Sequence, residues 1–188
     1  GESSLGGVRA LSVGCGAGTE LLDLVRWGAR SSRLTGVDVE PGRLRRARER
    51  HGDLGVARAD GACLPFRSAS FDLVLQFTLF TSVLDSGVRR SIAAEMLRVL
   101  AAGGLIVWYD FWPDNPANPE VRGIRPAEIR GLFPGCRIDF RRITLPPPLT
   151  RRLVPFSRTL TDLLSKVEFL KAFYLASIRK PERGDGHD

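Results

Sequence analysis

The sequence predicts an α/β protein built on a doubly wound, mostly parallel β-sheet. Short apolar runs typical of buried strands alternate with segments of helical periodicity over residues 8–111, and such alternation favours parallel strands joined by helical crossovers. A turn with three glycines follows the first run, and an acidic residue stands near the end of the second. Both features are typical of the ligand-binding edge of such a sheet.

Local patterns predict the first four elements. Residues 8–13 form an apolar run that predicts a strand, and residues 19–29 carry apolar side chains at helical spacing. The run LTGVDV at residues 34–39 predicts a second strand. Pro41 suits a first helical turn, so we expect an arginine-rich helix over residues 42–51.

The same alternation continues to residue 111. Residues 55–58 predict a short strand, and residues 71–77 (FDLVLQF) are nearly all apolar, as in a strand buried on both faces. Residues 87–100 have the pattern of an amphipathic helix. The glycines of residues 101–104 predict a turn, and residues 105–111 (LIVWYDF) predict another buried strand.

The sequence changes character after residue 111. Three prolines within residues 112–119 predict a loop. We expect residues 1–180 to form a single domain and residues 181–188 to be a flexible C-terminal tail. The remaining patterns predict a helix at 126–133, a strand at 136–145, a proline spacer at 146–148, a helix at 153–170 and a strand at 172–178.

Composition argues against several classes of protein. No apolar run approaches the roughly 18–20 residues that span a bilayer, and the first residues do not resemble a signal segment, so we expect a cytoplasmic protein without a membrane partner. The three cysteines are far apart and there are only two histidines. We therefore expect buried, reduced thiols, no disulfide framework and no bound metal.

The basic charge is concentrated near the C-terminus. The net charge is +7, and after residue 140 ten basic residues face five acidic ones. A basic face can attract nucleic acid, but aromatic residues do not interleave with these arginines as they do in single-strand binders. The sequence therefore favours a solvated basic surface over a nucleic-acid partner.

The three glycines predict a ligand platform. Gly14, Gly16 and Gly18 lie between the first strand and the first helix, where glycine permits a positive φ and close approach of a ligand to the backbone. Dinucleotide sites use G-x-G-x-x-G, whereas here the third glycine comes one residue early. A tight strand–helix turn without a ligand is the alternative.

Asp38 adds a second indication of a nucleoside ligand. It lies near the end of the second predicted strand, 20 residues after Gly18, where an acid can accept hydrogen bonds from ribose hydroxyls. The alternative role is capping of the helix that begins near Pro41.

The block RADGACLPFRSASFDLVL at residues 58–75, with VGCGAG before it and EMLRVLAAGG after it, resembles the class I S-adenosylmethionine-dependent methyltransferases, in particular their small-molecule branch. The resemblance covers residues 8–111. It implies a Rossmann-like, three-layer α/β/α fold with seven strands in the order 3-2-1-4-5-7-6 and an antiparallel last strand. It also implies S-adenosylmethionine as the cofactor.

The resemblance carries roles to particular residues. The glycine turn is expected under the methionine part of the cofactor, Asp38 at the ribose, Val39 beside the adenine, and Asp60 at the adenine amino group. The main chain of Gln76 is expected to contact the methionine amino group. The full set of expected cofactor-binding residues is Gly14, Cys15, Gly16, Gly18, Asp38, Val39, Asp60, Gly61, Ala62, Gln76 and Phe77.

Two departures from the family pattern are visible. Ser12 stands where the family often has an acid, so the cofactor's ammonium group lacks a charged partner at that position. The helical cap that commonly precedes the first strand is also missing, and the chain does not begin with Met. We therefore expect an N-terminal segment to be absent from this sequence.

The loops after the fourth and fifth strands are expected to face the acceptor. Residues 76–85 contain neither an (N/D)PP(Y/F) motif nor a Pro-Cys pair, which argues against amino methylation of DNA bases and against covalent pyrimidine chemistry. Tyr109 and Asp110 are the candidate catalytic residues, and alternation along a strand predicts that one of them faces the pocket. Capping of a helix or bracing of a loop is the alternative role for Asp110.

These observations predict a methyltransferase that acts on a small-molecule acceptor, with oxygen as the expected methyl-accepting atom. The arginine-rich composition suggests a bacterium with a GC-rich genome, and hence natural-product or glycan biosynthesis. The alternatives are an RNA or protein methyltransferase, a cofactor-binding accessory subunit without catalysis, and an NAD(P)-dependent reductase. The early third glycine and Asp60 argue against the reductase.

Overall fold

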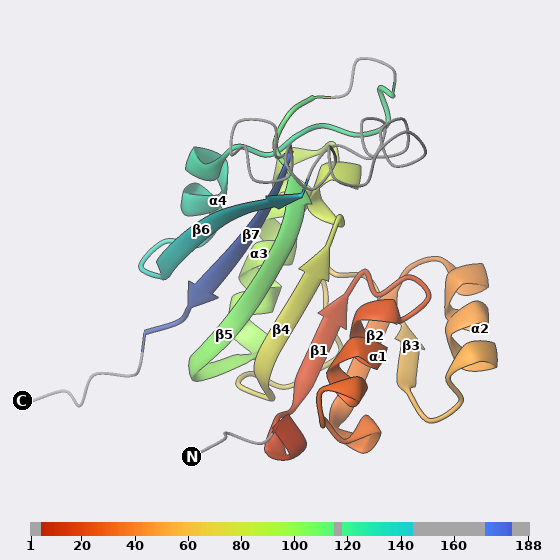
Figure 1. Cartoon of the computed structure of the whole chain (residues 1–188). Coiled ribbons are helices and arrows are strands. Elements are labelled where there is room, and N and C mark those ends of the chain that lie inside the picture. Colours follow the sequence, from red (N-terminus) through yellow and green to blue (C-terminus); the bar gives the residue numbers. More distant parts are fainter. Residues whose placement is uncertain (1–4, 115–117, 145–171, 182–188) are drawn as a thin grey trace, which may run out of the picture.

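A computed structural model of the chain describes residues 5–114, 118–144 and 172–181. It contains a seven-stranded sheet in the order β3-β2-β1-β4-β5-β7-β6 (Figure 1). Strands β1 to β5 pair in parallel, and β7 is antiparallel to both of its neighbours. The fold class, the strand order and the antiparallel last strand predicted from the sequence are therefore confirmed.

One half of the sheet contains the first three strands. These are β1 (Ala10–Val13), β2 (Leu34–Asp38) and β3 (Gly55–Arg58), joined by α1 (Thr19–Arg26) and α2 (Pro41–Arg50). Helix α2 begins at Pro41 because the Glu40 side chain accepts hydrogen bonds from two backbone N–H groups of the first turn.

The other half contains β4 (Phe71–Phe77), β5 (Leu100–Phe111), β6 (Arg137–Thr144) and β7 (Phe173–Arg179). Helix α3 (Ser86–Val99) connects β4 to β5, and the short α4 (Pro126–Leu132) precedes β6. The chain moves from β1 towards β3 on one side and from β4 towards β6 on the other, so the order reverses between β1 and β4. Parallel sheets bind ligands at such a switch point, beyond the carboxyl ends of the strands.

Two apolar clusters hold the helices on the sheet. Leu21 and Leu24 of α1 pack with Leu73 and Leu75 of β4. A larger cluster joins α3 and α4 to other side chains of β4, β5 and β7, and includes the fully buried Trp108 of β5. None of the helices among the described residues is long and apolar enough to cross a membrane.

Three expectations need correction or lie beyond the described residues. Residues 101–104 are not a separate turn but fall within β5, which already begins at Leu100; the pairing with β4 skips them, since Phe71 pairs with Leu100 and Leu73 with Leu105. Of the three thiols, Cys15 is buried but Cys63 is exposed and Cys136 is partly exposed. The proline spacer at 146–148, the helix at 153–170 and the tail after residue 181 fall outside the described residues.

Candidate functional site

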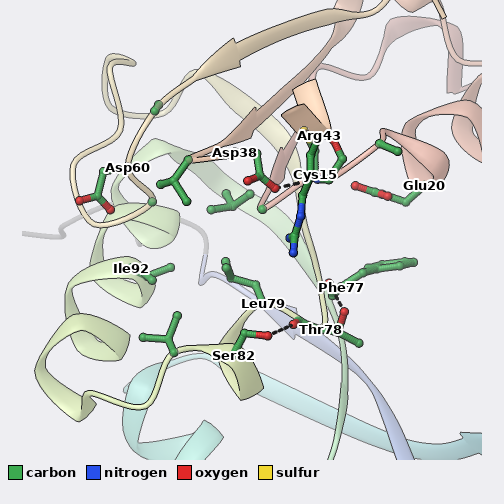
Figure 2. Close-up of a pocket in the computed structure, with 18 of the residues that line it drawn as sticks. Cys15, Glu20, Asp38, Arg43, Asp60, Phe77, Thr78, Leu79, Ser82 and Ile92 are labelled. Carbon is green, nitrogen blue, oxygen red and sulfur yellow. Dashed lines mark hydrogen bonds between the residues drawn. The ribbon is translucent and has the colours of Figure 1, made fainter. Parts of the chain in front are cut away.

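A cavity of about 610 Å³ lies at the switch point. Its walls come from the end of β1 with the glycine turn, the start of α1, the ends of β2 and β3, the segment after β4 and one face of α3 (Figure 2). This volume falls within the range of small-molecule sites. The cavity is thus where the parallel-sheet topology predicts a ligand.

The glycine turn has the backbone geometry that the sequence predicts. Gly14, Gly16 and Gly18 all have positive φ, at 71°, 52° and 76°. The turn is held against β2, because the backbone N–H groups of Gly14 and Cys15 both donate to the carbonyl of Val37, at 2.8 and 2.9 Å. At Gly16 an added Cβ would meet no atom within 4 Å, so the backbone there is open to the cavity.

Asp38 closes β2 beneath this turn. Its side chain is 5% exposed, and its two oxygens accept from the backbone N–H groups of Gly16 and Glu40, each at 2.9 Å. A carboxylate has about four acceptor positions, so Asp38 can brace the turn and still accept hydrogen bonds from a ligand. It also contacts the N-terminal side of α2, as the capping alternative anticipated.

Asp60 stands at the corresponding place after β3. It is exposed, lines the cavity, and one of its oxygens accepts from the backbone N–H of Ala62 at 2.8 Å. Gly61 also lines the cavity, where a Cβ would come within 3.1 Å of Val13. The turn after β3 therefore presents a carboxylate to the same space as Asp38, and its Gly61 leaves little room for a side chain.

The other predicted cofactor residues divide into two groups. Cys15, Val39 and Phe77 line the cavity. The Cys15 thiol packs against Gly36, and burial raises the pKa of this thiol to about 12. Gly18, Ala62 and Gln76 do not line the cavity and border it through neighbouring residues. Their roles in cofactor binding stay predictions.

The segment after β4 forms the wall opposite the glycine turn. Thr78 has a φ of 56°, a conformation that is uncommon for a residue other than glycine. The backbone N–H of Thr78 donates to the carbonyl of Tyr109 at 2.8 Å, and that of Leu79 donates to the side chain of Gln76 at 3.1 Å. Surrounding contacts therefore hold a strained backbone at this wall, as often happens at functional sites.

The candidate catalytic residues lie behind this wall. Asp110 is 1% exposed, and its carboxylate accepts from the hydroxyl of Thr81 at 2.6 Å and from the backbone N–H groups of Thr81 and Phe111. Burial raises the pKa of Asp110 to about 6, although these hydrogen bonds act in the opposite direction. These contacts match the alternative role of Asp110, which is to brace the loop after β4.

The ring of Tyr109 lies on the face of β5 opposite to Asp110, where it packs among aromatic side chains. It stacks on Phe173 with 4.9 Å between the ring centroids, and lies 5.4 Å from the ring of Phe77. Neither Tyr109 nor Asp110 is among the residues that line the cavity. A catalytic role for either residue stays a prediction.

Sequence reasoning missed two charged residues of the cavity, Glu20 of α1 and Arg43 of α2. Glu20 accepts a hydrogen bond from the Ser12 hydroxyl at 2.5 Å. Its position in the first turn of the helix after the glycines was a usable signal, because side chains there point back towards the preceding turn. Arg43 carried no such signal, since it is one of several arginines in α2.

Fold, topology and cavity together define an α/β protein of the Rossmann-like type with a cavity at the switch point of its sheet. A family model described as "Methyltransferase domain" matches residues 10–104, half of the chain. The chain belongs to this family, the class I S-adenosylmethionine-dependent methyltransferases.

Individual relatives agree with this assignment. A phthiotriol/phenolphthiotriol dimycocerosates methyltransferase of Mycobacterium tuberculosis is 34% identical over 133 residues, covering 70% of this chain and 48% of the relative. A sterol 4-C-methyltransferase of Caenorhabditis elegans is 28% identical over 119 residues, covering 60% of this chain and 34% of the relative. The chain thus spans at most about half the length of these curated relatives.

A solved structure supports the fold. The S-adenosylmethionine-dependent methyltransferase from Mesorhizobium loti superposes with a TM-score of 0.68 at 21% identity, covering 94% of this chain and 93% of that one. At this identity the similarity concerns the fold alone. The Rossmann-like architecture inferred from the sequence is therefore supported by an experimental structure.

Proposed function

We propose that this chain binds S-adenosylmethionine and transfers its methyl group to a hydroxyl oxygen of a small, largely apolar molecule. The observation that carries the proposal is the cavity itself, where an open glycine turn at Gly16 faces the carboxylates of Asp38 and Asp60. Hydroxyl and amino groups of adenosine are donors that such carboxylates accept. These acceptors thus fit the cofactor of the family.

The residues of the cavity would hold the cofactor in three parts. Asp60 and Val39 would receive the adenine, Asp38 the ribose, and the turn around Gly16 the amino-acid portion. When bound, the cofactor supplies a methyl group that is already activated for displacement. The protein then has to align the acceptor oxygen with the methyl carbon and exclude water.

The wall after β4 favours an apolar acceptor. Phe77, Leu79 and Val83 line the cavity there, and Val88 of α3 adds an apolar side chain that is 41% exposed. The names of the two relatives point to lipid acceptors for those proteins, a sterol in one and a phthiotriol dimycocerosate in the other. Both observations support an apolar acceptor more than RNA or a protein.

Calorimetry and turnover test the proposal in two stages. Titration with S-adenosylhomocysteine is expected to give binding, and titration with NADH is not; the reverse would contradict the proposal. Formation of S-adenosylhomocysteine is then measured with sterols, long-chain alcohols, phenols, sugars and RNA, using Gly16→Ala as the negative control. Turnover with RNA alone would exclude the small-molecule acceptor.

A cofactor-binding protein without methyl transfer is the second candidate. The observation in its favour is that neither Asp110 nor Tyr109 lines the cavity, so no predicted base faces the acceptor. Tight binding of S-adenosylhomocysteine without turnover on any acceptor of the panel would select this candidate.

A further inference from the structure

Glu20 is the one carboxylate of the cavity that the roles above leave unused. It lies in the first turn of α1, directly after the glycine turn, and its side chain is partly buried at the cavity wall. The hydroxyl of Ser12, itself fully buried in β1, donates to Glu20 Oε1 at 2.5 Å. Ser12 therefore fixes the direction of the carboxylate but brings no charge to neutralise it.

No cation of the described residues compensates this carboxylate. Glu20 takes part in none of the ion pairs among them. Arg43, the basic residue that lines the cavity, lies instead near Glu40, with 3.8 Å between Nε and Oε2. Burial raises the pKa of Glu20, and the nearby charges that act on it are the acids Asp23 and Asp38. A partly desolvated carboxylate without a counter-ion is a costly arrangement unless a ligand supplies the positive charge.

The three carboxylates follow the order of the strands. Asp60 comes after β3, Asp38 ends β2, and Glu20 follows β1 through the glycine turn, while the sheet order is β3-β2-β1. Figure 2 shows the same sequence across the cavity, with Asp60 at one side, Asp38 in the middle and Glu20 at the other. S-adenosylmethionine has its adenine, ribose and amino-acid portions in a matching linear order. Its ammonium group therefore belongs at the Glu20 end.

We propose that Glu20, held by Ser12, binds the ammonium group of the cofactor's amino-acid portion. The inference rests on the proposed function and names a residue for that portion of the ligand. Ser12 is a positioning residue in this arrangement, because it acts through Glu20. The helix thus provides the charge that the first strand, with Ser12 at this position, does not carry.

The test compares three ligands by calorimetry on the wild type and on Glu20→Gln. S-adenosylhomocysteine carries both the ammonium and the carboxylate, its decarboxylated analogue S-adenosyl-3-thiopropylamine keeps only the ammonium, and 5′-methylthioadenosine has neither. Glu20→Gln is expected to weaken the two ammonium ligands by roughly 10- to 100-fold, the loss expected for one charge-assisted hydrogen bond. Binding of 5′-methylthioadenosine is expected to change less than about twofold on the same argument.

Asp23→Asn is the matched control on the same helix, since Asp23 pairs at the surface with Arg26 and does not line the cavity. It is expected to change each of the three affinities by less than about twofold, because Asp23 acts on Glu20 only as a nearby charge at the surface. Thermal unfolding adds a second readout: Glu20→Gln removes a charge without a counter-ion and is expected not to lower the melting temperature of the free protein.

The outcomes separate the two levels of the proposal. Equal weakening of all three ligands by Glu20→Gln, or weakening of none, overturns the assignment of Glu20 while leaving the proposed function in place. Failure of the wild type to bind any of the three ligands overturns the proposed function itself, and this inference with it. Selective loss of the ammonium ligands supports both.

Discussion

On the β3-β2-β1 side of the switch point, the cavity is formed by backbone and by short acidic side chains. Gly14, Gly16 and Gly18 curve the main chain around an open space, and Asp38 holds the turn by accepting from the N–H of Gly16. On the β4-β5 side, the wall depends on contacts between residues far apart in the sequence. Thr81 is held by Asp110, 29 residues away, and Thr78 is held by the carbonyl of Tyr109.

This difference indicates which half tolerates variation. The glycine turn depends on the backbone freedom of its three glycines and on one neighbouring strand, β2, through the carbonyl of Val37 and the carboxylate of Asp38. The wall after β4 depends on pairs of residues on different elements, such as Thr81 with Asp110 and Thr78 with Tyr109. We therefore expect substitutions in the first half to affect cofactor affinity, and substitutions in the second half to affect stability, pH dependence or turnover.

The largest expected effect is at Gly16. Gly16→Ala places a methyl group in the open part of the cavity and is expected to weaken S-adenosylhomocysteine by at least about 100-fold, or roughly 3 kcal/mol. Gly28→Ala is the matched control, because Gly28 also has a positive φ (96°) and open space around its Cβ position but lies outside the cavity. Both variants should lose about 1–2 kcal/mol of unfolding free energy. Equal affinity of the two variants for S-adenosylhomocysteine would mean that the glycine turn does not contact the cofactor.

In the second half, Asp110 is expected to make stability depend on pH. Its pKa of about 6 lies above the usual value for aspartate, so the folded state binds the proton more tightly than the unfolded state. The stability from this group is complete below about pH 4 and is lost as the pH rises through about 6. Relative to Asp110→Asn, the wild type should lose up to about 3 kcal/mol of unfolding free energy between pH 4 and 7.5.

Urea unfolding at several pH values measures this term. Asp72→Asn is a control of opposite sign, because the ion pair with Arg9 lowers the pKa of Asp72 and its contribution is lost as the pH falls. A difference between wild type and Asp110→Asn that does not change with pH would mean that folding does not raise the pKa of Asp110.

How much the sequence predicts follows the same division. The positive φ of the three glycines and the acids after β2 and β3 depend on local patterns, and the structure has them at the expected places. The orientation of Asp110 could not be predicted, because strand alternation states that neighbours face opposite sides but not which side holds the cavity. Its partner Thr81 is set by the tertiary fold.

The predicted turn at residues 101–104 was wrong for a related reason. Gly103 and Gly104 are local signals for a turn, and Gly103 has a positive φ of 70°, yet β5 already begins at Leu100 and the carbonyl of Gly104 accepts from Lys180 N directly after β7. Gly104 also has no room for a side chain, since a Cβ there would come within 2.8 Å of Leu100. The ladder with β7 begins only at Leu105, and the contact of Gly104 with a residue over 70 positions away has no signal in the local sequence.

A smaller effect should distinguish the two acids of the first half. Asp38→Asn is expected to weaken S-adenosylhomocysteine about 10-fold, because an amide cannot accept from both Gly16 and Glu40 and has fewer positions for ribose hydroxyls. Asp60→Asn is expected to weaken it only about threefold, because Asp60 is exposed and water competes for the same hydrogen bonds. Calorimetry measures both; a larger effect at Asp60 would reverse the assignment of the two subsites.

The smallest effect is expected at Tyr109, and it is the sharpest test of the difference between the halves. The ring of Tyr109 is fixed by Phe173 and Phe77, while its hydroxyl makes no hydrogen bond with the described residues, so Tyr109→Phe should cost less than about 0.5 kcal/mol of stability. Tyr174→Phe is the matched control, since that hydroxyl accepts from Arg142 at 3.2 Å, and it should cost about 1 kcal/mol. Turnover of Tyr109→Phe on an acceptor from the panel is expected to stay within about twofold of the wild type. If the hydroxyl instead takes the proton of the acceptor, turnover should fall by at least about 100-fold with unchanged cofactor affinity, and the β4-β5 half would then contain the catalytic base rather than a supporting wall.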